Sequence, residues 1–203
     1  MQTQTFLQLI QQHYQFNRAN KIFAKPELKY CWKHWLSTEL IISLDNIGEI
    51  EINAPYIAPE NNDEDNAFLS FKTGDKKATT VEKRQASKCD FLITRDNKLS
   101  YVEVRCVQSE QLLQARELKK FTADIERVNA LKEANPALNI LTLFAIYGQF
   151  QNKDMQKLTS LDNSENTGYV LDTDMTGSGS IARFSQVRRD GSPRIMLFAH
   201  TAR

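Results

Sequence analysis

Apolar and polar residues alternate along the chain in patterns that predict both helices and strands. Apolar residues recur at helical spacing in three segments, residues 3–17, 26–44 and 109–135. Apolar runs bounded by turn residues predict strands at residues 49–57, 68–72, 88–95, 99–107 and 138–147. Residues 181–189 and 194–200 are expected to form a C-terminal hairpin around Asp190 and Gly191. This order predicts an α/β fold in which a mixed central sheet is flanked by helices.

The hairpin predicted at residues 88–107 brings charged residues together. Asp96 and Asn97 tolerate the left-handed conformations that a tight two-residue turn requires. Such a turn sets Asp90 opposite Glu103 and Lys88 opposite Arg105, with all four on one face. The other face then carries apolar residues suited to a core, namely Cys89, Phe91, Ile93, Val102, Val104 and Cys106.

Two carboxylates placed opposite each other in this way repel unless a cation lies beside them. One solution is a pair of diagonal salt bridges on an exposed face, Asp90 with Arg105 and Glu103 with Lys88. The other is a divalent cation, Mg²⁺ or Mn²⁺, held by both carboxylates and the backbone carbonyl of Val104. The hairpin alone leaves both solutions open.

Glu39 is a third acid with an unusual position. It follows Trp32 by seven residues and Trp35 by four, which places it within the apolar face of the helix predicted at residues 26–44. The tryptophans themselves are expected to be core residues. An acid on that face is explained if its carboxylate points toward the same cation as Asp90 and Glu103.

The order of these elements resembles the PD-(D/E)XK nuclease superfamily, which has the restriction-endonuclease-like fold. The resemblance covers residues 27–147 of an expected single domain, residues 1–203, and leaves residues 148–203 as a C-terminal extension. It rests on the helix with Glu39, the strand with Asp90, the sequence Tyr101-Val102-Glu103-Val104-Arg105, a long helix and a buried strand. It implies that Asp90 and Glu103 bind Mg²⁺ or Mn²⁺ and that Glu39 completes the site.

One position departs from this family's motif. The family has a lysine two residues after the glutamate, where it positions or activates the attacking water, whereas this chain has Arg105. A guanidinium stays protonated and cannot act as a general base. Arg105 can still bind a phosphate and stabilise charge that develops on it, which leaves activation of water to the metal. The alternative is that the site has lost catalysis.

The charge balance excludes a protein that binds nucleic acid through bulk positive charge. The chain has 26 basic and 25 acidic residues and a net charge of +1. Basic residues are nevertheless concentrated locally, and the candidates for nucleic-acid contacts are Lys76, Lys77, Lys83, Arg84, Lys88, Arg188 and Arg189.

Three functional hypotheses follow. The first is a metal-dependent nuclease that hydrolyses phosphodiester bonds in DNA, with Asp90, Glu103, Arg105 and Glu39 as its catalytic residues. The second is an inactive protein of the same fold that binds nucleic acid or a protein partner, with a homodimer also compatible. The third is an α/β domain whose charged hairpin face is only solvated.

The remaining composition indicates an intracellular setting. The three cysteines show no CxxC spacing, so neither a disulfide framework nor a cysteine zinc site is expected. No apolar run approaches the length of a membrane span. These features predict a cytoplasmic protein without a membrane partner.

Overall fold

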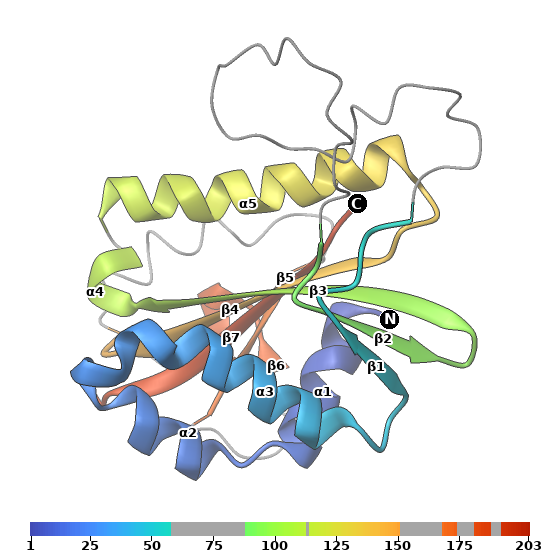
Figure 1. Cartoon of the computed structure of the whole chain (residues 1–203). Coiled ribbons are helices and arrows are strands. Elements are labelled where there is room, and N and C mark those ends of the chain that lie inside the picture. The colour runs from blue at the N-terminus through green and yellow to red at the C-terminus, as the bar shows by residue number, and fades with distance from the viewer. Residues whose placement is uncertain (58–87, 113, 151–167, 174–180, 188–191) are drawn as a thin grey trace, which may run out of the picture.

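The computed structural model describes residues 1–57, 88–112, 114–150, 168–173, 181–187 and 192–203. These residues form an α/β protein with a mixed, open, seven-stranded sheet in the order β1-β2-β3-β4-β7-β5-β6 (Figure 1). The strands are β1 (Glu49–Ile52), β2 (Phe91–Arg95), β3 (Lys98–Gln108), β4 (Ile140–Gly148), β5 (Gly168–Asp172), β6 (Ile181–Ala182) and β7 (Arg194–Thr201). The helices are α1 (Thr3–His13), α2 (Phe16–Phe23), α3 (Trp32–Leu44), α4 (Ser109–Leu112) and α5 (Ala115–Ala134), with 3₁₀ turns at Pro26–Cys31 and Phe184–Gln186.

The sheet is mixed because β3 and β4 are parallel, while the other neighbouring strands pair antiparallel. Parallel neighbours need a crossover connection, and here α4 and α5 provide it. The mixed sheet flanked by helices, expected from the sequence, is therefore confirmed.

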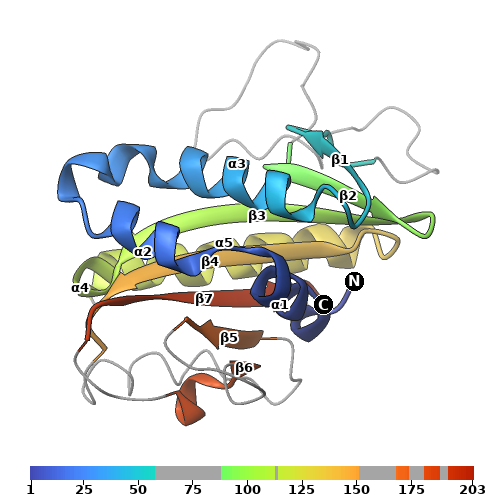
Figure 2. The same ribbon diagram turned by 90° about the horizontal axis from the view of Figure 1, so that it is seen from below.

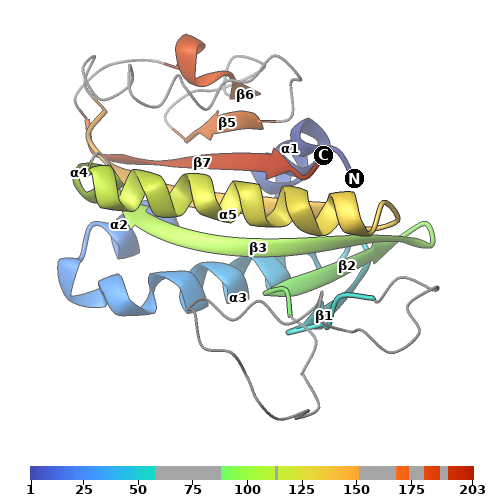
Figure 3. The same cartoon turned by 90° about the horizontal axis from the view of Figure 1, so that it is seen from above.

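Helices cover both faces of the sheet. Figure 2 shows α1, α2 and α3 against one face, and Figure 3 shows α5 lying across the other. On the α3 face, Leu36 packs in one core with Val102 and Val104 of β3. On the α5 face, the ring centroids of Phe121 and Phe144 lie 3.7 Å apart. The strand β4 is buried on both faces, as its continuous apolar run predicts.

Each of the three predicted helices is interrupted in the structure. The first ends at His13, because Tyr14 is extended with ψ of 137°, and a separate helix, α2, follows. The second begins as a 3₁₀ turn before α3, and the third is divided into α4 and α5. The expected buried stripe of α5 is confirmed, since Phe121 and Val128 are buried and Leu118 and Ile125 pack against the core.

The predicted C-terminal hairpin is wrong. The strand β7 lies between β4 and β5 in the middle of the sheet, and β6 pairs with β5 instead. β7 is almost entirely buried, which is typical of a central strand.

The predicted turn of the β2–β3 hairpin is confirmed. Asp96 and Asn97 have φ of 51° and 58°, in the left-handed region. The observed register runs from Arg95 opposite Lys98 to Phe91 opposite Val102, as a two-residue turn predicts. The predicted strand at residues 68–72 lies outside the described residues. Among the described helices, none combines the length and apolar character that crossing a bilayer requires.

Candidate functional site

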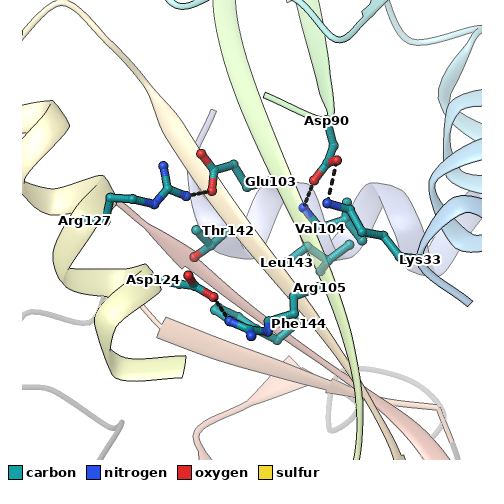
Figure 4. Close-up of a pocket in the computed structure, with 10 residues that line it drawn as sticks. All are labelled: Lys33, Asp90, Glu103, Val104, Arg105, Asp124, Arg127, Thr142, Leu143 and Phe144. Carbon is teal, nitrogen blue, oxygen red and sulfur yellow. Dashed lines mark hydrogen bonds and ion pairs between the residues drawn. The ribbon is translucent and has the colours of Figure 1, made fainter. Parts of the chain in front are cut away.

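A pocket of about 350 Å³ lies beside the first residue of β2, at the point where β3 continues beyond its pairing with β2. The paired part of β2 stops at Phe91, opposite Val102, but β3 extends to Gln108. Figure 4 shows the residues around the pocket, which come from α3, β3, β4, α5 and the residue before β2. They are Lys33, Asp90, Glu103, Val104, Arg105, Asp124, Arg127, Thr142, Leu143 and Phe144.

Asp90 terminates the β2–β3 ladder. Its backbone N–H donates to the carbonyl of Val102 at 3.0 Å. Its carboxylate Oδ2 accepts a hydrogen bond of 2.7 Å from the backbone N–H of Val104, and its Oδ1 lies 2.8 Å from Nζ of Lys33. The Asp90 carboxylate therefore accepts a hydrogen bond that a backbone carbonyl of a neighbouring strand normally accepts. The side chain points toward α3.

The predicted arrangement of the hairpin faces is wrong beyond Phe91. Asp90 pairs with α3 rather than sharing the face of Glu103, and Cys89 packs in the core cluster of the α5 face with Tyr101. Lys88 forms an isolated bridge with Pro55 instead of facing Arg105. The alternation of faces is lost because the ladder ends at Phe91, so the two-residue period no longer applies.

Glu103 points to the α5 face and is bound on both of its oxygens. Its Oε1 accepts a hydrogen bond of 2.5 Å from the hydroxyl of Tyr56, and its Oε2 forms an ion pair with Arg127 (Figure 4). Burial raises the pKa of Tyr56, and the charge of Glu103 raises it further. Burial lowers the pKa of Arg127, but the charge and hydrogen bond of Glu103 outweigh this and raise it.

The two predicted diagonal salt bridges do not form between the described side chains. Asp90 pairs with Lys33, Glu103 with Arg127, and Arg105 with Asp124 of α5. The partner of each of these three hairpin charges is therefore a helical residue. The pocket contains three acids and three basic residues, so its formal charges balance.

Glu39 does not line this pocket. Its carboxylate lies 3.2 Å from Arg18 of α2, and its side chain is 21% exposed. It follows Lys33 by six residues, which corresponds to about 9 Å along the axis of α3 and about 120° around it. Lys33 and Glu39 therefore lie on different faces of α3, and the structure brings only Lys33 to Asp90.

The pocket offers oxygen donors that fit a hard divalent cation. The backbone groups of Val102 and Val104 bond to Asp90, so the alternation of the strand directs the Val104 carbonyl toward the same open edge. Mg²⁺ is commonly held by one or two carboxylates and retains several waters. Within the described ranges, no group of three or more His, Cys, Asp or Glu side chains is arranged for a metal ion. Asp90, Glu103 and the Val104 carbonyl are oxygen donors, the type of ligand that Mg²⁺ and Mn²⁺ prefer.

Most of the candidate nucleic-acid contacts fall outside the described residues. This applies to Lys76, Lys77, Lys83, Arg84, Arg188 and Arg189. Lys88 is described and exposed, next to the pocket residue Asp90.

Sequence reasoning missed four residues of this site: Lys33, Tyr56, Asp124 and Arg127. One signal was available for α5. Asp124 lies three residues after Phe121, so this acid falls on the apolar stripe of its helix, just as Glu39 falls on the apolar face of its own helix. For Lys33 and Tyr56, the local pattern carries no such signal.

No protein-family model matches this chain, and no curated protein or solved structure is significantly similar to it.

Proposed function

We propose that this chain is a metal-dependent nuclease of restriction-endonuclease-like fold that hydrolyses phosphodiester bonds in DNA at the Asp90–Glu103 pocket. One observation carries the proposal: Asp90, just before β2, and Glu103, in the middle of β3, line the same pocket where the pairing of these two strands stops. The parallel pair β3 and β4, joined through α5, is the arrangement expected of this fold. Glu39 is not part of the proposed site.

Asp90, Glu103 and the carbonyl of Val104 would hold a Mg²⁺ or Mn²⁺ ion. When bound, such an ion polarises a phosphoryl oxygen and lowers the pKa of its bound water, so no protein base is required. By holding that ion, Asp90 and Glu103 would set where the reacting phosphate binds. Arg105 and Arg127, on the α5 side, would bind the phosphate oxygens and stabilise the additional charge of the transition state.

Lys33 differs in geometry from Arg105. Its ammonium is a compact charge with three N–H donors, whereas the planar guanidinium binds oxygen atoms in pairs. Lys33 Nζ lies 2.8 Å from Asp90 Oδ1, so it is placed to orient the attacking water beside the metal ligand. It reaches the pocket from α3 rather than from the strand position that Arg105 takes.

The balance of charge in the pocket makes substrate binding depend on the cation. Three acids and three basic residues give the pocket no net formal charge. A bound divalent cation raises this charge by two, which complements a phosphodiester and its more negative transition state. We therefore expect DNA to bind weakly without the metal.

Cleavage of supercoiled plasmid and single-stranded DNA with Mg²⁺ or Mn²⁺ tests the proposal. Asp90→Asn and Glu103→Gln each remove a ligand charge, and we expect either to lower the rate at least about 100-fold, since metal stabilisation of the transition state is worth several kcal/mol. Asp96→Asn and Glu49→Gln make the same chemical changes at exposed positions and should leave the rate unchanged.

A second function has its own support. Arg105 replaces the usual lysine, and all three acids of the pocket are paired with basic side chains of this chain. Both features suit an inactive protein of the same fold that binds nucleic acid or a protein partner. A wild-type protein that binds single-stranded DNA in EDTA and never cuts it would favour this second function. Unchanged cleavage in both carboxylate variants would contradict the nuclease proposal.

A further inference from the structure

The segment after β1, residues 53–57, runs beside two of the pocket acids, Asp90 and Glu103. We call it the β1 extension. The backbone N–H of Asn53 donates to the carbonyl of Asp90 at 3.1 Å, and the N–H of Cys89 donates to the carbonyl of Ala54 at 3.0 Å. An isolated bridge between Pro55 and Lys88 continues this pairing. The β1 extension therefore holds the backbone that carries Asp90.

The same segment contacts Glu103 through Tyr56. The Tyr56 side chain is only 2% exposed, and its ring centroid lies 4.9 Å from that of Tyr101. Its hydroxyl donates to Oε1 of Glu103 at 2.5 Å. The side-chain amide of Asn135 donates to the carbonyl of Ile57 at 3.0 Å, which anchors the end of the segment to the residue after α5.

We propose that Tyr56 is a positioning residue for the metal site, an inference that rests on the proposed function. It touches neither the metal nor the substrate, and it acts through Glu103. A carboxylate has about four acceptor positions on its two oxygens. Tyr56 and Arg127 take one on each oxygen, which fixes the plane of the carboxylate and leaves acceptor capacity on both oxygens for a cation. The β1 extension thereby sets the position of Glu103 relative to Asp90.

Tyr56→Phe tests this role because it removes one oxygen atom and keeps the buried ring. Loss of a hydrogen bond to a metal ligand commonly lowers metal affinity about 10-fold to 100-fold. We expect that fall in the affinity for Mn²⁺, measured by isothermal titration calorimetry and by the electron paramagnetic resonance signal of free Mn²⁺. Tyr101→Phe is the matched control, since it removes a hydroxyl from the adjacent buried ring, whereas the described side chains that bond to Glu103 are those of Tyr56 and Arg127.

A double-mutant cycle separates positioning from a general effect on the fold. In a Glu103→Gln background, the residual Mn²⁺ affinity should be the same with and without Tyr56→Phe, because the ligand that Tyr56 positions has lost its charge. Near-UV circular dichroism of each variant checks that the aromatic core is retained. Equal Mn²⁺ affinity of wild type and Tyr56→Phe, or a loss that persists in the Glu103→Gln background, overturns the inference. Absence of Mn²⁺ binding by the wild type contradicts the proposed function itself.

Discussion

The ion pair between Arg194 and Asp172 joins β7 to β5 inside the protein. Arg194 Nε and Nη2 lie 2.8 and 2.9 Å from the two carboxylate oxygens of Asp172. The side chains are 0% and 3% exposed, so solvent does not screen either charge. Breaking such a buried pair from one side costs about 3–5 kcal/mol, because the remaining charge stays in the interior after its counter-charge is removed.

Asp172→Asn makes this change with almost no change in volume. A loss of about 3–5 kcal/mol corresponds to a fall in Tm of about 6–20 °C for a domain of this size, measurable by differential scanning calorimetry. Asp96→Asn is the matched control, since the Asp96 side chain is 84% exposed and pairs with Arg95 only at 3.5 Å. We expect the control to unfold like the wild type.

The double variant Asp172→Leu with Arg194→Met addresses the cause of that loss. Replacing both charges by apolar side chains leaves no buried charge that has lost its counter-charge, so most of the lost stability should return. A Tm for Asp172→Asn within about 2 °C of the wild type would refute the reasoning, since it would mean that the Arg194 charge does not depend on Asp172.

Two further predictions concern stability and cysteine chemistry. Gly148→Ala should lower Tm, because Gly148 has φ of 145° and an added Cβ would lie 2.1 Å from Oγ of Ser109; a thermal shift assay that finds no change would contradict this. Iodoacetamide at pH 8 should modify the exposed Cys31 but not Cys89 or Cys106, because burial raises the pKa of both thiols to about 12, and peptide mapping would detect the difference. The Cys89 and Cys106 thiols lose their protons near pH 8.5 in the unfolded chain and near pH 12 in the folded chain. The free energy of unfolding should therefore fall as the pH rises through that interval.

The sequence by itself determined the elements that depend on local chemistry. Asp96 and Asn97 specify the hairpin turn because their side chains tolerate positive φ, and the observed turn has that conformation. The apolar run of β4 specifies a strand buried on both faces, because only a central position covers both sets of side chains. These predictions needed no knowledge of which distant segments meet.

The place of β7 depended on tertiary structure. Its apolar residues are compatible with a hairpin partner nearby or with a distant strand, and local sequence does not distinguish the two. In the structure, β7 pairs with β4 and β5, which bury it on both faces. Arg194, the first residue of β7, is neutralised there by Asp172 of β5.

For the candidate site, the sequence identified Asp90, Glu103 and Arg105, because turn register is a local property. Their partners were decided by the way α3 and α5 cross the sheet, which brings Lys33 to Asp90 and Arg127 to Glu103. The exclusion of Glu39 has the same origin, since a helix face acquires its neighbours only when the helix docks. Side-chain charge is written in the sequence, but the partner that neutralises it is set by packing between elements far apart in the chain.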